Sequence, residues 1–190
     1  MDALAHLRHL IASLDEVLVD ALCARARFRR NEALYALADD DPPDLDMLAG
    51  RFSTTATLAG RTRLLRPAYL RRLMPALCLP GTDDSPAPCL SADAACLDAL
   101  ARRLSLSVHV ATRKREALPE DLQEAIRTGE PRLVEQAITY LPVEQVVRSR
   151  VSARAAGTAP RPDTPNAVAA LYDEWIIPLS RKIQVAGLLA

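Results

Sequence analysis

Apolar residues recur at intervals of three or four positions near the start of the chain, at Leu4, Leu7, Ile11, Leu14, Leu18 and Leu22. This spacing places them on one face of a helix. We therefore predict a long amphipathic helix over residues 3–38. The run of three aspartates and two prolines at 39–43 is expected to end it.

The middle of the chain predicts two further helical regions around a linker. A helical stretch is expected to begin after Asp44 and to run through residues 48–77, with an interruption near Pro67. Residues 80–88, PGTDDSPAP, are rich in proline and small polar residues and predict the clearest linker. Ser91 suits the N-cap of a third helix over residues 92–116.

The last third predicts shorter helices and one disturbed long helix. Helical pieces are expected over 119–127, 131–139 and 142–156, the last opening on a proline. Thr164 is expected to cap the final helix, and Pro178 should kink that helix because proline removes a backbone donor. No segment favours a strand, so the predicted fold class is all-α, a single-domain helical bundle.

Composition and charge narrow the class of protein. The 190 residues are 49% hydrophobic and 25% charged, which is enough apolar material for a core. The 24 basic and 24 acidic residues cancel, so no partnership with nucleic acid or a membrane surface is expected. The chain shows neither a run of about 20 apolar residues nor a signal layout, which predicts a soluble, cytoplasmic protein.

The sequence contains no familiar cofactor or metal motif. The four cysteines, Cys23, Cys78, Cys89 and Cys96, form no CxxC pair and are expected to be reduced. No histidine is spaced from them as a zinc ligand would be. The chain also lacks GxGxxG, GxxxxGK[ST], GxSxG and HExxH. We therefore expect no cofactor and no metal.

Two cations share one face of the third predicted helix. Arg103 and Lys114 are 11 residues apart, or about 16 Å along a helix. Both could reach inward over the small residues Ser107 and Ala111, with a small anion between them. The alternative is that two surface cations share a face by chance.

Three more polar residues have both a structural and a functional interpretation. Ser180 and Gln184 are stacked one turn apart beside Pro178, either as ligand contacts or as a solvated polar stripe. Glu144 lies in the first turn after Pro142, where favourable interaction with the helix dipole alone would explain it.

Four segments, in order, carry a family resemblance. They are LRHLIASLDEVLVDALCARARFRRNEALY, CLDALARRLSLSVHVATRK, AITYLPVEQVVRSRV and VAALYDEWIIPLSRKIQVAGLL. Together they cover about half of the chain and resemble the eukaryotic-type chorismate mutases, the all-helical plant and fungal branch. Residues 39–90 match poorly and are shortened. The resemblance implies one domain over residues 1–190, a homodimer, and an isomerase of aromatic amino acid biosynthesis (the shikimate pathway) that rearranges chorismate to prephenate.

The resemblance also implies roles for individual side chains. Arg8 and Arg103 would clamp the two substrate carboxylates, because a guanidinium fork fits a carboxylate. Lys114 and Gln184 would donate to the ether oxygen of chorismate. Since the fungal pattern has Glu in place of Gln184, and an amide donates at any pH, activity is expected to persist on the alkaline side of neutrality.

The remaining implied contacts are weaker or altered. Glu144 would accept a hydrogen bond from the ring hydroxyl, Ser180 would be an auxiliary polar contact, and Tyr140 stands where the fungal pattern has Asn. The shortened segment includes the region that helps to build the family's effector site, so weak or absent feedback by Trp and Tyr is expected. Two rival functions stay open: an isochorismate pyruvate-lyase on the same scaffold, and a catalytically silent helical module that binds a small acid or a protein.

Overall fold

The computed structural model describes residues 3–35 and 44–190, and within these the chain is helical without a strand. In chain order the elements are α1 (Ala3–Arg25), the 3₁₀ turn η1 (Glu32–Leu34), α2 (Leu45–Thr54), α3 (Leu58–Ala68), the π-helical turn η2 (Tyr69–Leu73), α4 (Met74–Leu77), α5 (Ala87–Ala117), α6 (Glu120–Thr128), α7 (Pro131–Ile138), α8 (Leu141–Thr158), α9 (Thr164–Leu171), the π-helical turn η3 (Tyr172–Ile176) and α10 (Ile177–Leu189). The predicted all-α class is confirmed.

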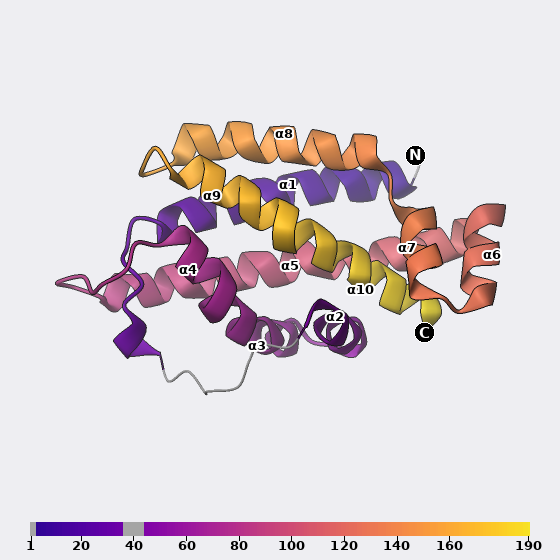
Figure 1. Ribbon diagram of the computed structural model, residues 1–190, viewed down its shortest axis with the longest axis horizontal. Coiled ribbons are helices and arrows are strands. Elements are labelled where there is room, and N and C mark those ends of the chain that lie inside the picture. The colour runs from indigo at the N-terminus through magenta and orange to yellow at the C-terminus, as the bar shows by residue number, and fades with distance from the viewer. Residues whose placement is uncertain (1–2, 36–43) are drawn as a thin grey trace.

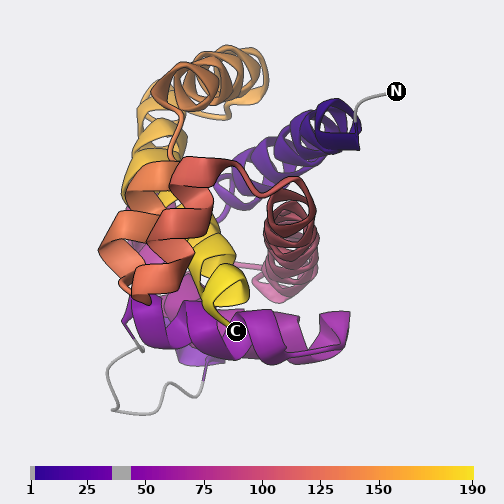
Figure 2. The same ribbon diagram turned by 90° about the vertical axis from the view of Figure 1, so that its right-hand side faces the viewer.

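Long helices run side by side along the molecule. Helices α1, α5 and α8 and the rod formed by α9, η3 and α10 follow the long axis, while α6 and α7 close one end (Figure 1). Helix α1 packs on α5 and α8, and α10 packs on α2 and α5. Seen from the end that α6 and α7 close, α1 and α5 lie on one side and α7 and α8 on the other (Figure 2).

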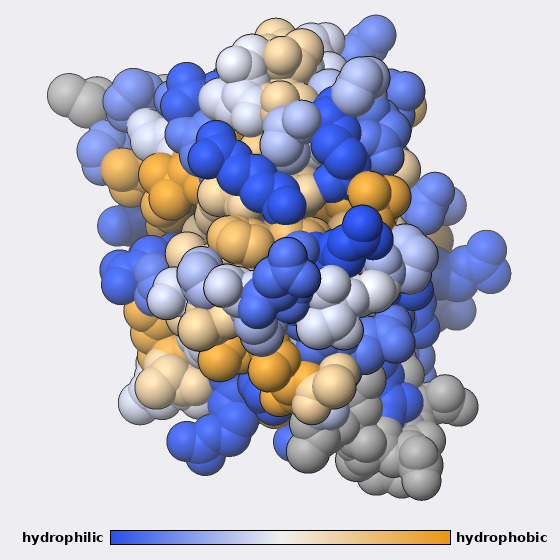
Figure 3. Space-filling view, turned by 90° about the vertical axis from the view of Figure 1, so that its left-hand side faces the viewer, coloured by the Kyte–Doolittle hydropathy of each residue, from blue (hydrophilic) through white to orange (hydrophobic). Residues whose placement is uncertain are grey.

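Two apolar clusters hold these elements together. The larger one joins α1, the segment α2–α4, α5 and the α9–α10 rod, with buried side chains such as Leu22, Phe52, Leu100 and Ile183. A smaller cluster fixes α6 and α7 against α5 and α10. At the opposite end of the molecule, hydrophilic side chains alternate with small apolar areas (Figure 3), as expected of a solvated face.

Helix α1 ends at Arg25, well before the predicted residue 38. The guanidinium of Arg25 is buried; it donates to the carbonyl oxygen of Arg29 at 2.9 Å and to Asp93 Oδ1 at 2.5 Å. The chain therefore folds around this side chain instead of continuing as a helix. The last residues of the predicted helix, 36–38, and its expected breaker at 39–43 lie outside the described residues.

The second helical stretch has a break that the sequence did not predict, in addition to an irregularity near Pro67. It breaks at residues 55–57, where the Thr57 side chain accepts a hydrogen bond from the amide of Gly60 and caps α3. Pro67 lies inside α3 and does not end it. The irregularity comes later, as the π-helical turn before Pro75, because an extra residue in the turn accommodates a proline that cannot donate.

The final helix also has a π-helical turn just before a proline, Pro178. The turn η3 directly precedes α10, whose second residue is Pro178, so the predicted disturbance of this helix is confirmed. The expected cap at Thr164 is wrong: Thr164 is already helical, and its buried hydroxyl has no hydrogen-bond partner.

The remaining helix boundaries agree closely with the predicted ones, except at the start of α5. Helices α6, α7 and α8 begin and end within two residues of the predicted positions. Helix α5 begins at Ala87 instead of residue 92, so Ser91 lies inside it and is not a cap. Proline at position 88 is tolerated there because the amides of the first turn have no helical partner.

Two further sequence expectations concern the cysteines and the possibility of a membrane-spanning helix. All four cysteines are buried and unpaired with one another. No helix in the described part of the chain combines the length and apolarity needed to cross a bilayer.

Candidate functional site

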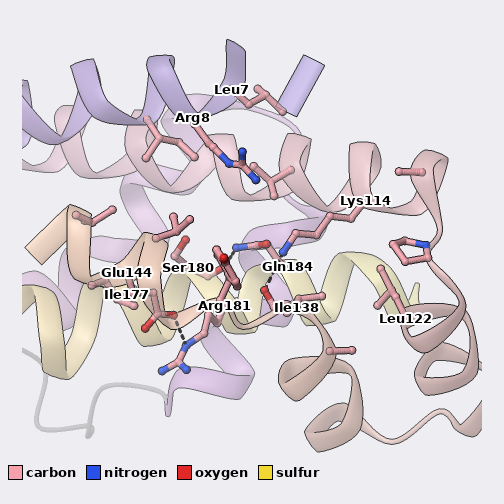
Figure 4. A pocket seen from close by; sticks show the side chains of 18 of the residues that line it. Leu7, Arg8, Lys114, Leu122, Ile138, Glu144, Ile177, Ser180, Arg181 and Gln184 are labelled. Carbon is pink, nitrogen blue, oxygen red and sulfur yellow. Dashed lines mark hydrogen bonds and ion pairs between the residues drawn. The ribbon is translucent and has the colours of Figure 1, made fainter. Parts of the chain in front are cut away.

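One cavity of about 390 Å³ lies between α1, α5, α6, α7, α8 and α10. All seven side chains singled out in the sequence line it: Arg8, Arg103, Lys114, Tyr140, Glu144, Ser180 and Gln184. Figure 4 shows Arg8 reaching from α1 toward Lys114 and Gln184. The bundle thus brings together residues that are up to 176 positions apart in the chain.

Arg103 is held by a buried carboxylate that the sequence analysis missed. Its Nε donates to Asp15 Oδ1 at 2.6 Å, and Arg150 Nη2 donates to the other oxygen of Asp15 at 2.8 Å. The hydroxyl of Tyr172 lies 3.2 Å from Asp15 Oδ1. The Nη1 of Arg103 is buried and has no partner. Asp15 therefore fixes one edge of the guanidinium and leaves a donor for a ligand.

A signal for Asp15 was present in the sequence. It follows Ile11 by four residues and precedes Leu18 by three, so a charge stands on the apolar face of α1. A buried carboxylate needs positive partners, and Arg103 and Arg150 are those partners. The helical pattern could not say which cations would reach it.

Lys114 is the second cation of α5 in the cavity. Its Nζ donates to the carbonyl oxygen of Ile138, at the end of α7, at 3.1 Å. Burial and the nearby positive charge of Arg8 lower the pKa of Lys114 to about 8. No carboxylate within salt-bridge distance of the ammonium is found among the described residues, so its charge is available to an anion.

The α10 side of the cavity presents short polar groups. Ser180 is buried, and its hydroxyl lies 2.7 Å from that of Ser107 on α5. Gln184 Nε2 donates to the carbonyl oxygen of Ser180 at 3.2 Å, while its Oε1 is buried without a partner. The amide nitrogen carries two hydrogens, so Nε2 keeps a second donor for a ligand beside its bond to Ser180.

Glu144 lies between two arginines. Arg148 Nη2 is 3.4 Å from its Oε2, and Arg181 Nε is 3.6 Å from its Oε1. Its side chain is only 13% exposed. Both contacts are long, so the carboxylate keeps lone pairs for a ligand hydroxyl. Arg181 also lines the cavity, and the sequence analysis did not identify it.

Apolar side chains complete the cavity wall. They come from α1, α5, α8 and α10, namely Leu7, Ile11, Val110, Val143, Val147 and Ile177. Tyr140 precedes α8 at the cavity's edge and is 64% exposed. The cavity therefore combines a cationic side, a carboxylate and an apolar wall, which suits a small cyclic ligand with more than one carboxylate. Within residues 3–35 and 44–190, His, Cys, Asp and Glu side chains form no metal-ligand cluster.

Comparison with known proteins identifies the family. Residues 91–185 match the family model described as chorismate mutase type II. The chain belongs to the chorismate mutase family. The match includes six of the seven lining residues expected from the sequence, all except Arg8. Members of this family are isomerases.

Curated relatives agree with this assignment. The cytosolic chorismate mutase 2 of Zea mays is 25% identical over 98% of this chain and 95% of its own length. The chloroplastic chorismate mutase 3 of Arabidopsis thaliana is 33% identical over 64% of this chain, and the aligned part covers only 43% of that protein. The chorismate mutase of Emericella nidulans is 29% identical over 66% of this chain and 53% of its own length.

Solved structures share the fold along nearly the whole chain. The chloroplast chorismate mutase of Zea mays superposes with a TM-score of 0.77 at 23% identity, covering 99% of this chain and 95% of that one. The chorismate mutase of Candida albicans, in complex with L-Trp, superposes with a TM-score of 0.77 at 19% identity, covering 98% of this chain and 90% of that one. At these identities the likeness establishes the all-helical chorismate mutase fold.

Proposed function

We propose that this chain rearranges chorismate to prephenate in the cavity described above. The observation that carries the proposal is the convergence of Arg8, Arg103 and Lys114 on one cavity with an apolar wall. Chorismate is a cyclic dicarboxylate, so its charges match the cations and its ring matches the wall.

The two arginines supply positioning. Arg103 offers its unpartnered Nη1 to one substrate carboxylate, and Arg8 approaches the other from α1. The rearrangement is intramolecular and pericyclic, so holding the two reacting arms in contact removes much of the entropic barrier. The buried tether to Asp15 keeps Arg103 in place without filling its free donor.

Lys114 and Gln184 supply electrostatic stabilisation. The ether oxygen gains negative charge as its bond to the ring breaks, and a donor aimed at it lowers the barrier. Lys114 is placed to donate as a charged group and Gln184 as a neutral one. On the opposite side, Glu144 accepts a hydrogen bond from the ring hydroxyl, and Ser180 adds a polar contact.

Product identification tests this function. Purified protein is incubated with chorismate and, separately, with isochorismate, and the products are separated by chromatography. We expect prephenate from chorismate. Release of pyruvate from isochorismate, without turnover of chorismate, would assign the lyase activity instead. Binding of either compound without turnover would indicate the silent module.

The pKa of Lys114 revises the expected pH dependence. Activity needs the ammonium, which is present below a pKa of about 8 and lost above it. We therefore expect kcat/KM to fall about tenfold per pH unit above pH 8, since this parameter reports the free enzyme. The amide of Gln184 does not titrate, so it adds no pH dependence of its own. The activity expected on the alkaline side of neutrality assumed that Lys114 has the ordinary pKa of a lysine.

Rates between pH 6 and 10 in the parent and in Lys114→Arg decide this assignment. The arginine variant is slower, and its profile should stay flat to pH 10 because a guanidinium keeps its proton. A parent profile that is flat to pH 9.5 would contradict the assignment of the alkaline limb to Lys114.

Feedback by aromatic amino acids is expected to be weak or absent. The alignment with the cytosolic maize relative extends over 240 positions against 190 residues here, which fits a shortened chain. Initial rates at low chorismate should be hyperbolic and change less than twofold with added Trp or Tyr. Sigmoidal kinetics relieved by Trp would show that an effector site is retained.

Assembly and location follow the same resemblance. We propose a homodimer, as the family resemblance implies, and Val17 on α1 and Val146 on α8 leave apolar surface for such a contact. A cytoplasmic location is proposed from the cytosolic maize relative. Other relatives carry chloroplastic names, among them the Arabidopsis protein above.

A further inference from the structure

Arg181 lines the cavity, yet the proposed reaction gives it no role. It follows Ser180 on α10, and its Nε lies 3.6 Å from Glu144 Oε1 on α8 and 3.6 Å from Glu135 Oε1 on α7. Figure 4 shows the ion pair with Glu144 at the edge of the cavity. The guanidinium therefore joins two carboxylates that come from different helices.

These groups belong to a longer chain of alternating charges. The other oxygen of Glu144 is approached by Arg148, and Arg148 Nε is bound to Asp173 in the turn η3. The order is thus Asp173, Arg148, Glu144, Arg181 and Glu135. Glu144 is the central member and the most buried, at 13% exposure against 27% for Arg181 and 29% for Glu135.

The lengths of the contacts matter for what Glu144 can do. Neither arginine makes a short hydrogen bond to Glu144, since the distances are 3.4 and 3.6 Å, and Arg181 Nε is buried with no hydrogen-bond partner. The arginines thus balance the negative charge without using up its lone pairs. Such a carboxylate can be held in place and still accept a hydrogen bond from a ligand.

We propose that Arg181 is a positioning residue that orients the carboxylate of Glu144 toward the substrate hydroxyl and acts on the substrate only through Glu144. This inference rests on the proposed chorismate mutase function. Glu135 anchors Arg181 from α7, so the pair also ties the α7 wall of the cavity to the carboxylate.

Loss of Arg181 leaves Glu144 with one cation. That cation, Arg148, stands one turn along the same helix and has Asp173 as its closer partner. The carboxylate then turns toward Arg148 and away from the cavity. Misdirecting the carboxylate weakens a hydrogen bond to a charged group, so Arg181→Met should lower kcat/KM about tenfold. Most of the change should appear in KM, because the hydroxyl contact exists before the transition state.

A double-mutant cycle tests the proposal. Arg181→Met, Glu144→Gln and the double variant are compared with the parent by chorismate turnover, with folding checked by circular dichroism. We expect Arg181→Met to cost about tenfold alone and less than twofold in the Glu144→Gln background. Arg181→Lys should recover most of the rate, because a contact at 3.6 Å needs charge and not a fork.

The neighbouring cation provides a matched control. Lys182 also forms an ion pair, with Asp46 at 2.6 Å, but that contact joins α10 to α2 outside the cavity. Lys182→Met should leave kcat and KM within twofold of the parent. It therefore reports what removal of a cation at this point of α10 does by itself.

Each outcome decides the question. A tenfold cost of Arg181→Met that persists in the Glu144→Gln background would mean that Arg181 contacts the substrate directly, and the positioning role would be wrong. A cost below twofold in the parent background would also overturn it, while the proposed function would stand. A parent that does not turn over chorismate would overturn both.

Discussion

Replacement of Lys114 by methionine should lower kcat by about 10²–10³, the usual cost of removing one preorganised donor to developing charge. The ammonium contributes most when the ether bond breaks, so kcat should fall more than KM rises. Among the described residues, the one hydrogen bond that the variant loses is the bond to the carbonyl oxygen of Ile138. Steady-state kinetics with chorismate measure the change.

The same variant should be at least as stable as the parent. The pKa of Lys114 is lowered, mainly by burial, which means that the folded protein disfavours its charged form. Methionine has a similar shape and removes that penalty, so the thermal midpoint at pH 7 should not fall. Loss of activity without loss of stability is typical of a functional residue and not of a core residue.

Lys182 again supplies a control, since it is the only other lysine of the chain. Lys182→Met should turn over chorismate within twofold of the parent rate. If Lys114→Met keeps near-parental kcat while folded, the cavity has been assigned to the wrong reaction. The silent-module interpretation would then take its place.

Much of the fold could be predicted because helical periodicity is a local property. Helices α6, α7 and α8 have proline near their first residues and a polar boundary, and they begin and end close to the predicted positions. The long helices were misjudged where a distant group decides the boundary. The end of α1 depends on Arg25 meeting Asp93, which is 68 residues away.

The site shows the same division between local and distant information. Arg103 and Lys114 share a helix face at 11-residue spacing, so their common orientation was readable from the sequence. The roles of Arg8, Glu144 and Gln184 in one common site came from the family resemblance, since no spacing rule links three separate helices. Arg181 was missed because one more arginine in an Arg-rich chain carries no signal until Glu135 and Glu144 are brought next to it.

Asp15 provides the second large expected effect, on stability and activity together. Asp15→Ala removes the counter-charge of buried Arg103 and of Arg150, and breaking a buried pair from one side costs about 3–5 kcal/mol. For a domain of this size, that corresponds to a fall of roughly 10 °C in the thermal midpoint. Thermal unfolding followed by circular dichroism measures it.

An exposed ion pair on the same helix provides a control that distinguishes the effect of burial from the effect of charge. Asp20 on α1 makes two hydrogen bonds to Arg154, at 2.8 and 2.5 Å, but both side chains are 42% exposed. Exposed ion pairs contribute about 0–1 kcal/mol, so Asp20→Ala should change the midpoint by less than about 3 °C and leave chorismate turnover unchanged.

The variant Asp15→Asn isolates the orienting role. Its amide oxygen still accepts from Arg103 Nε, but the charge that holds the guanidinium against α1 is gone. We expect a milder loss of stability and a fall of about tenfold or more in kcat/KM, because Nη1 of Arg103 no longer has a fixed direction. A folded Asp15→Asn with parental kcat/KM would show that the carboxylate serves stability alone, and that Arg103 finds the substrate without it.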